Sequence, residues 1–297
     1  MKSKQHKAYV FAILAILLWS TVASAFKLSL RYVNIELLLF FSAFTSLIVL
    51  TLILLFTGKI REVLKLRFKD IRFTILLGSL NPFLYYLVLF TAYDALPAQE
   101  AMTLNYTWPL VLSLLSAPLL GQKLTVKSMI ALLISFMGII IIATDGNPAS
   151  LEFENSKGTL LAIGSSLIWA LFWLFNVRNK LNETIKLFFN FLWGSIFIFI
   201  FILLTGKFEI PDGYGLGGAV YIGLFEMGIT FVLWLKAMQI TSRTDKISQL
   251  VFLSPFLSLF FIHIFVGEKI HIYTFVGLVL IVSGIILQQY KRKHAKD

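Results

Sequence analysis

One apolar stretch, residues 97–123, holds the side chains with the clearest capacity for chemistry. It contains an acid, an amide, two aromatic rings and a proline: Glu100, Asn105, Tyr106, Trp108 and Pro109. The stretch is long enough to cross a bilayer, and hydrocarbon penalises such groups unless they face a protein interior or a water-filled cavity. Pro109 has no amide hydrogen, so the carbonyl of Asn105 needs a partner from elsewhere. These features predict that the stretch forms one wall of a substrate path. The alternative is a kinked helix that only packs against its neighbours, with its polar groups in buried hydrogen bonds.

Five further apolar stretches carry polar or aromatic groups that could face the same path. These groups are Trp19 and Ser20, Asn81 and Tyr85, Trp169, Trp173 and Asn176, Glu226, and Gln249. Trp169, Trp173 and Asn176 share one helix face by their spacing, which favours a common wall. A Trp near the end of a span is more often an interfacial residue, and this alternative applies to Trp19 and Trp234.

Two acids lie within these apolar stretches, and each has two interpretations. Glu226 is the stronger anomaly, because it falls deep in its span. It is predicted to be a proton site or a contact for a cationic amino group, and the alternative is a protonated or hydrogen-bonded structural acid. Glu100 is a second candidate for a proton or charge site, although its place near the outer boundary also fits a hydrated side chain.

Three prolines fall within predicted spans and are expected to soften the helices that gate the path. Pro82, Pro109 and Pro255 each remove one backbone donor, so the carbonyl four residues earlier loses its helical partner. We expect these positions to act as hinges.

Composition places the chain among membrane proteins. Of 297 residues, 58% are hydrophobic and 14% are charged, whereas a soluble domain carries about 25% charged residues. There is no Cys, and the four His residues do not have metal-ligand spacing, so neither a metal site nor a cofactor is expected. Without an intramembrane His pair, an acidic cluster or a Ser/His arrangement, an enzyme is disfavoured.

Ten spans are predicted, joined by short connectors. Their approximate bounds are 8–27, 35–56, 71–92, 97–118, 126–143, 157–177, 184–205, 215–236, 244–266 and 270–290. The first follows a basic start, as in a secretory signal, but it is interpreted as a retained helix. With a cytoplasmic N-terminus, 21 of the 26 Lys and Arg residues fall on the inner side, which predicts cytoplasmic termini. The net charge of +11 is therefore explained by topology and anionic lipid, with no nucleic acid partner.

An internal repeat divides the chain. Trp108-Pro109, Gly121-Gln122-Lys123 and Gly138 align with Ser254-Pro255, Gly267-Glu268-Lys269 and Gly284 at a constant offset of 146. The predicted halves are 1–144 and 157–297, joined by an extracytoplasmic linker, 145–156. Because five spans are an odd number, the second half enters the membrane inverted, which is typical of alternating-access transporters. The predicted fold is an all-α integral membrane protein with two inverted five-helix repeats around a central cavity.

Small residues in the fifth and tenth spans predict close helix packing. Ser135 with Gly138, and Ser283 with Gly284, would let these two helices approach each other and could join the halves.

The whole pattern resembles the drug/metabolite transporter superfamily, EamA-type. Within it, Leu18-Trp19-Ser20-Thr21, and Asn105-Tyr106-x-Trp108-Pro109 with Gly121-Gln122-Lys123, resemble the aromatic amino acid exporters. The resemblance implies a ten-helix basket whose cavity is lined by helices one, three, four, six, eight and nine, the six that polarity had selected. Glu226 departs from that branch, because an acid is not expected there.

These observations predict an exporter of small metabolites in the bacterial cytoplasmic membrane, with aromatic or hydrophobic amino acids as the leading substrates. The alternative is a carrier of drugs or other metabolites, such as nucleotide sugars, with proton coupling through Glu226. Few cations lie within the spans, which disfavours a phosphorylated substrate. The expected partners are a small-molecule substrate and the lipid bilayer, and the expected state is a monomer or a weak homo-oligomer.

Overall fold

The computed structural model describes residues 2–120, 126–148, 155–206, 209–241, 247 and 250–289, and all regular elements among them are helices. In the first half these are α1 (Lys2–Ser29), α2 (Ile35–Phe56), α3 (Ile60–Val63), α4 (Phe68–Gly78), the π-helix η1 (Ser79–Leu84), α5 (Tyr85–Ala95), α6 (Ala98–Asn105), α7 (Trp108–Leu120) and α8 (Val126–Ala143). In the second half they are α9 (Ser156–Arg178), α10 (Glu183–Thr205), α11 (Gly213–Phe225), α12 (Ile229–Ile240), the 3-10 helix η2 (Leu250–Leu253), α14 (Ser254–Phe261), the π-helix η3 (Ile262–Val266) and α15 (Ile272–Gln289).

Six helical segments within the described residues are long and apolar enough to cross a membrane. They are Lys4–Ser29, Ile35–Phe56, Phe68–Ala95, Ser156–Asn176, Glu183–Thr205 and Gly213–Ile240. Shorter apolar helices follow at Met129–Ala143, Leu250–Val266 and Ile272–Leu287. The chain is therefore a multi-pass membrane protein. The count of ten spans remains a prediction.

Side-chain caps and glycines explain where several helices begin and end. Asn34 accepts from the amide of Leu37 at 2.9 Å to start α2, and Asp212 accepts from Gly215 at 2.7 Å to start α11. Each cap satisfies one of the amides that a helix start leaves without a partner. Gly206 ends α10 with φ +67°, a left-handed conformation in which a glycine carries no steric penalty.

Three of the apolar spans are interrupted rather than merely kinked. The predicted span 97–118 is two helices, because α6 ends at Asn105 and α7 begins at Trp108, next to Pro109. The span that contains α4 and α5 is interrupted at Asn81, whose φ of −145° and ψ of 121° are not helical. The span of α11 and α12 is interrupted between Phe225 and Ile229.

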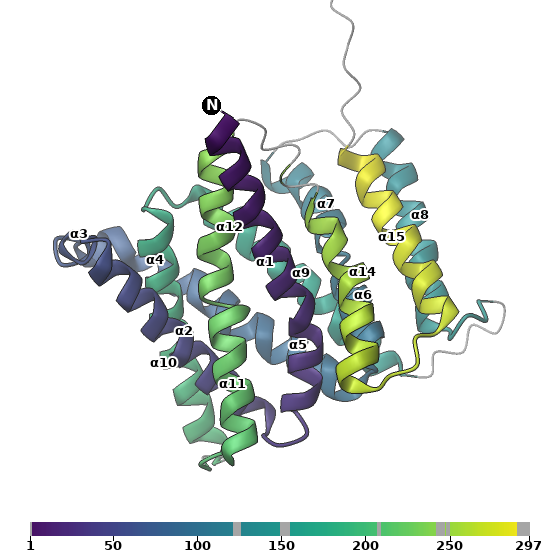
Figure 1. The fold of residues 1–297 in the computed structure, drawn as a ribbon, viewed down its shortest axis with the longest axis horizontal. Coiled ribbons are helices and arrows are strands. Elements are labelled where there is room, and N and C mark those ends of the chain that lie inside the picture. Colours follow the sequence, from purple (N-terminus) through teal and green to yellow (C-terminus); the bar gives the residue numbers. More distant parts are fainter. Residues whose placement is uncertain are drawn as a thin grey trace, which may run out of the picture.

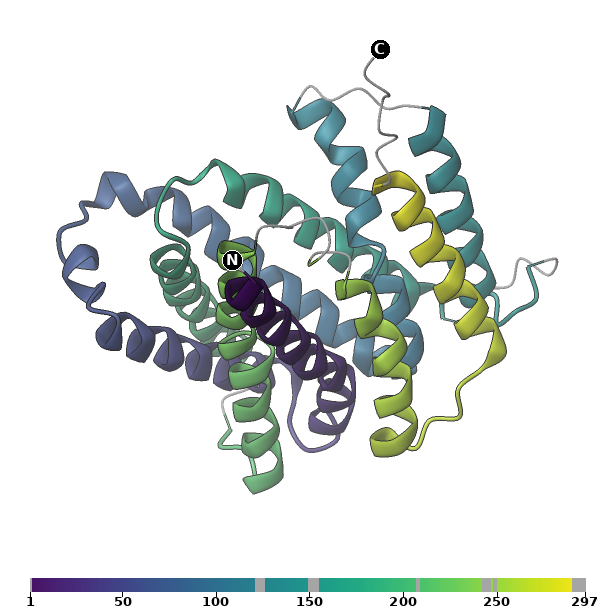
Figure 2. The ribbon, with the colours of Figure 1, turned by 45° about the horizontal axis from the view of Figure 1, so that its top comes forward.

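α8 and α15 pack as a pair at one side of the bundle, as both views show (Figures 1 and 2). A Cβ on Gly138 would lie 2.7 Å from the carbonyl oxygen of Gly277, and a Cβ on Gly284 would clash with Ser135. Ser135 also donates its hydroxyl to the carbonyl of Ile281 at 3.3 Å. This confirms the predicted close packing, with one correction: Gly277 faces α8, whereas Ser283 is exposed.

Two glycines bring the halves together elsewhere. A Cβ on Gly78 would lie 2.6 Å from the carbonyl oxygen of Asn190, so α4 lies directly against α10. A Cβ on Gly223 would lie 2.5 Å from the carbonyl oxygen of Ser42, so α11 lies directly against α2. In Figure 1, α1 begins and α15 ends at the same end of the bundle, which we call the inner end, and the opposite end is the outer end.

Candidate functional site

A cavity of about 750 Å³ lies among α1, α5, α6, α7, α9, α12 and α14. Nine of the predicted residues line it: Trp19, Tyr85, Asn105, Tyr106, Trp108, Pro109, Trp169, Trp173 and Glu226. Its floor lies toward the outer end, at Phe26 and Tyr93, in the last turns of α1 and α5. Its mouth is marked by Arg178, an exposed residue at the inner end of α9. The cavity therefore reaches from the last turns of α1 and α5 to the inner end of α9.

Aromatic rings from four helices form a continuous wall. The rings of Tyr85 and Trp169 lie 4.5 Å apart between centroids, and Trp169 meets Phe231 at 6.2 Å. Trp19 of α1 meets Phe231 at 6.0 Å and Trp234 at 5.5 Å. Ring pairs at these separations attract one another and present both faces and edges to a ligand. The wall suits a molecule with an aromatic or apolar body.

Hydrogen bonds fix the polar groups of the broken span. The Asn105 amide donates to the Ser165 hydroxyl at 2.8 Å, and its oxygen accepts from the Tyr85 hydroxyl at 3.3 Å. Tyr106 donates its hydroxyl to the carbonyl of Val251 at 2.7 Å, which ties the first half to η2 in the second. The side chains at the break between α6 and α7 are thus held by hydrogen bonds to α5 in the first half and to α9 and η2 in the second.

Glu226 lies in the break between α11 and α12. Its carboxylate accepts a hydrogen bond from the Tyr86 hydroxyl at 3.0 Å. The hydroxyl of Thr230 donates to the carbonyl of Phe225, which the break would otherwise leave without a helical partner. Among the described lining residues, Glu226 is the one acid and Arg178 the one strong base. A carboxylate can hold a cationic amino group by charge, and the surrounding aromatic rings can add cation–π attraction.

Several predicted residues do not line the cavity. Ser20, Asn81, Pro82, Glu100, Asn176 and Pro255 are absent from its wall, and Gln249 lies outside the described residues. Ser20 is buried and donates to the carbonyl of Ile16 at 2.6 Å. Pro82 lies against α10, because a Cβ on Gly194 would meet its ring at 2.4 Å. Glu100 accepts from the hydroxyl of Tyr273 at 3.3 Å, away from the cavity.

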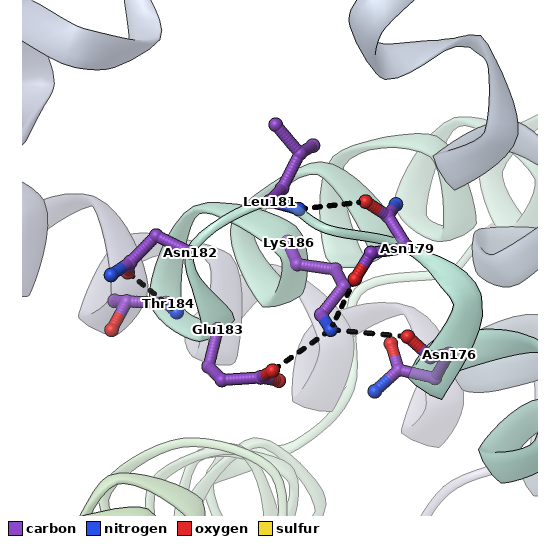
Figure 3. Close-up of polar contacts among 7 residues, drawn as sticks. All are labelled: Asn176, Asn179, Leu181, Asn182, Glu183, Thr184 and Lys186. Carbon is purple, nitrogen blue, oxygen red and sulfur yellow. Dashed lines mark hydrogen bonds and ion pairs between the residues drawn. The ribbon is translucent and has the colours of Figure 1, made fainter.

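Asn176 belongs instead to a cluster that joins the end of α9 to the start of α10 (Figure 3). The Lys186 ammonium donates to the carbonyl of Asn176 at 3.1 Å and to that of Asn179 at 3.2 Å, and it pairs with Glu183 at 2.9 Å. A cation at this position satisfies carbonyls that a helix end leaves unpaired and complements its dipole. Lys186 falls at the start of the predicted span 184–205, and it is 1% exposed.

The sequence did not indicate several lining residues. Phe26, Tyr93 and Met102 form the floor, and they carry no signal beyond apolar character. Trp234 also fitted an interfacial ring, and Arg178 falls just past the predicted span 157–177. The spacing of Glu226 and Trp234 on one helix face was the available signal for Trp234. Among the described residues, no three His, Asp or Glu side chains gather as metal ligands would.

One family model and several transporters of unknown substrate match this chain. The sequence model of the EamA-like transporter family matches residues 6–144 and 156–288. The uncharacterized transporter YvbV of Bacillus subtilis (strain 168) is 24% identical over 237 residues, covering 78% of this chain and 76% of that protein. An uncharacterized transporter of Archaeoglobus fulgidus is 22% identical over 291 residues, covering 96% of this chain and 100% of that protein.

A solved structure, titled "Crystal structure of protein", has the same fold. It aligns with a TM-score of 0.68 at 22% identity and covers 95% of each chain. Because the family match spans most of the sequence, the conclusion is direct: this chain belongs to the EamA-like transporter family.

Proposed function

We propose that this protein exports amino acids with aromatic or hydrophobic side chains across the bacterial cytoplasmic membrane. The observation that carries the proposal is the Glu226 carboxylate within a ring-lined cavity of about 750 Å³. The substrate ammonium would approach Glu226, and its side chain would lie against Trp169 and Tyr85. Asn105 is the nearby amide whose donors and acceptors would orient the polar end.

The proposal includes alternating access between two inverted five-helix halves, 1–144 and 157–297, with 145–156 as the linker. The two segments matched by the family model fall on either side of this linker, which supports the division. The contacts of Gly78 with α10 and of Gly223 with α2 are reciprocal between the halves, as a repeat would produce. A rocking motion of one half against the other would expose the central cavity to each side in turn.

Cytoplasmic termini are part of the same proposal. The start of α1 and the end of α15 lie at one end of the bundle (Figure 1), which an even number of spans would require. The excess of Lys and Arg in the predicted inner segments supports a cytoplasmic position for that end. The cavity, which extends to Arg178, would then be open to the cytoplasm, where an exported metabolite is loaded.

A flux assay tests the substrate class. Purified protein in liposomes should exchange labelled Trp and Phe, and Trp169→Ala should reduce the exchange strongly because it removes the central ring. Asn105→Ala should weaken exchange less. Tyr214→Ala is a matched control, because this ring is 76% exposed at the start of α11 and does not line the cavity. Absence of exchange of Trp, Phe and Thr would reject amino acids as substrates.

A second candidate is a proton-coupled carrier of drugs or other metabolites. The specific observation in its favour is that Glu226 is held by the Tyr86 hydroxyl rather than by a cation. Such an acid can exchange a proton with the cavity and couple its release to substrate movement. Imposing a pH gradient on the liposomes distinguishes the two: proton-coupled flux would follow the gradient, and Glu226→Gln would abolish that response.

A further inference from the structure

Beyond the floor of the cavity, three side chains hold the outer end of the bundle together. They are Lys27, Gln99 and Glu268, which we call the outer clasp together with the backbone groups that they bind. Lys27 follows Phe26 directly in α1, so it lies just past the floor. Gln99 is the second residue of α6, and Glu268 lies in the connection between η3 and α15.

Lys27 holds the end of α5. Its ammonium donates to the carbonyl of Tyr93 at 2.7 Å and to that of Leu96 at 2.7 Å. These carbonyls belong to the last turn of α5, where helix carbonyls lack amide partners and the helix dipole attracts a cation. Because Tyr93 also lines the floor, the same bonds keep that ring in place beneath the cavity.

Glu268 holds the start of α6 from the other half of the chain. Its two carboxylate oxygens accept from the amide of Ala98 at 2.7 Å and from that of Gln99 at 3.2 Å. These are the first amides of α6, which an anion satisfies well. Glu268 also attracts Lys27 electrostatically. The cation and the anion therefore bind opposite sides of one chain reversal, between α5 and α6.

Gln99 completes the clasp with its own side chain. Its amide nitrogen donates to the carbonyl of Lys269 at 3.0 Å, and its oxygen accepts from the amide of His271 at 3.0 Å. Gln99 is 1% exposed, so these bonds are shielded from water. Six hydrogen bonds thus join α1, the α5–α6 reversal and the η3–α15 connection.

We infer that the outer clasp is the outer gate of the transport cycle, with Lys27, Gln99 and Glu268 as its positioning residues. The inference rests on the alternating access of the proposed function. It assigns a role to groups that do not line the cavity. For the outer end to open, α1 and the η3–α15 connection must separate from the α5–α6 reversal, and these bonds must exchange for bonds to water. The clasp therefore favours the state with the cavity open at the inner end.

Accessibility from each side of the membrane tests this without any substrate. The chain has no Cys, so Ala23→Cys places a single thiol on the cavity wall. Its labelling by a membrane-impermeant maleimide is measured separately from the two sides of oriented vesicles. With the clasp intact, labelling from the inner-end side should be fast, and labelling from the outer-end side should be slow.

Glu268→Gln and Lys27→Met should each raise the outer-side labelling rate of the Ala23→Cys chain by about tenfold, because losing a charged partner shifts the population toward the opposite state. Gln99→Ala should raise it less, since no charge is lost. Lys269→Gln is the matched control: it removes a neighbouring exposed charge, keeps the carbonyl that Gln99 binds, and should leave the rate unchanged.

Equal outer-side labelling rates in the clasp variants and the Lys269→Gln control would overturn the inference. If Lys27→Met does not fold, the nearly isosteric Glu268→Gln and the uncharged Gln99→Ala decide the question by the same comparison. Failure of the amino acid flux assay leaves this result unaffected, because thiol labelling requires no substrate. The two proposals therefore fail separately.

Discussion

Two broken helices, one in each half, share a close glycine contact before the break but serve different purposes at it. In the first, Gly78 packs on α10, and the helix is interrupted three residues later at Asn81. In the second, Gly223 packs on α2, and the helix is interrupted three residues later at Glu226. The contacts before the breaks are closely alike, at 2.6 Å and 2.5 Å from a carbonyl oxygen of the partner helix.

The breaks differ in what they place near the substrate. Asn81 is fully buried and off the cavity, and Pro82 packs on Gly194 of α10. In the second break Glu226 lines the cavity, and Gly228 stands 146 residues after Pro82, at the repeat offset. The first break is filled by helix packing, whereas the second brings an acid to the cavity. Similar glycine contacts before a break therefore do not imply similar chemistry at it, and the side chain at the break decides the role.

The largest expected effect is on stability, and it tests whether the two glycine contacts are equally tight. Gly78→Val and Gly223→Val should each lower the free energy of unfolding by about 1–3 kcal/mol, because a side chain at either position meets a backbone carbonyl that cannot move away cheaply. Thermal unfolding in detergent measures this. Gly217→Val is the control in α11, since a Cβ there meets nothing within 4 Å. A loss of stability in one of these variants but not in the other would contradict the reciprocal packing of the halves.

The next largest effect is on substrate exchange, and it tests whether the second break alone serves transport. Glu226→Gln should reduce substrate exchange in liposomes by about tenfold, equivalent to about 1.4 kcal/mol, because it removes the charge at the cavity wall. Asn81→Ala should leave exchange per folded molecule within about twofold, because Asn81 does not line the cavity. Equal losses in the two variants would show that both breaks serve transport.

A smaller effect concerns the partner of the acid. Tyr86→Phe removes the hydroxyl that donates to Glu226 and should destabilise the protein by about 1 kcal/mol, because it leaves a buried carboxylate without that bond. Tyr85→Phe is the comparison: it removes a longer bond, 3.3 Å to Asn105, and leaves a neutral partner. The melting temperature should fall less for Tyr85→Phe, and the reverse order would argue against the Glu226–Tyr86 bond.

The sequence predicted the helical spans well and the orientation of their faces less well. The predicted spans 35–56 and 184–205 lie within a residue of α2 and α10, since runs of apolar residues bounded by capping Asn side chains define both. The interruption near Pro109 was anticipated as a kink, yet the chain there forms two separate helices. Proline predicts a lost hydrogen bond, but the extent of unwinding depends on neighbours such as Ser165 and Val251.

Site residues were predicted where several polar or aromatic groups shared one helix face. Trp169 and Trp173 line the cavity with Glu226, whereas Asn176, one turn on, lies off the cavity at the end of α9, where its backbone carbonyl accepts from Lys186. Spacing fixes which residues share a face, but the rotation of that face depends on helix packing. For the same reason, the floor at Phe26 could not be predicted, since an apolar ring is equally compatible with lipid, core and cavity.

The α8–α15 pair has a consequence for how the protein is made. Ser135 and its bonded carbonyl, Ile281, are 146 residues apart, so α8 leaves the ribosome long before its packing surface on α15 exists. During that interval the small residues around Gly138 contact lipid or another protein. The first half therefore lacks the packing that α15 later provides. Nascent chains truncated before α15 should therefore be captured selectively by membrane insertases or proteases that recognise unpaired small-residue surfaces.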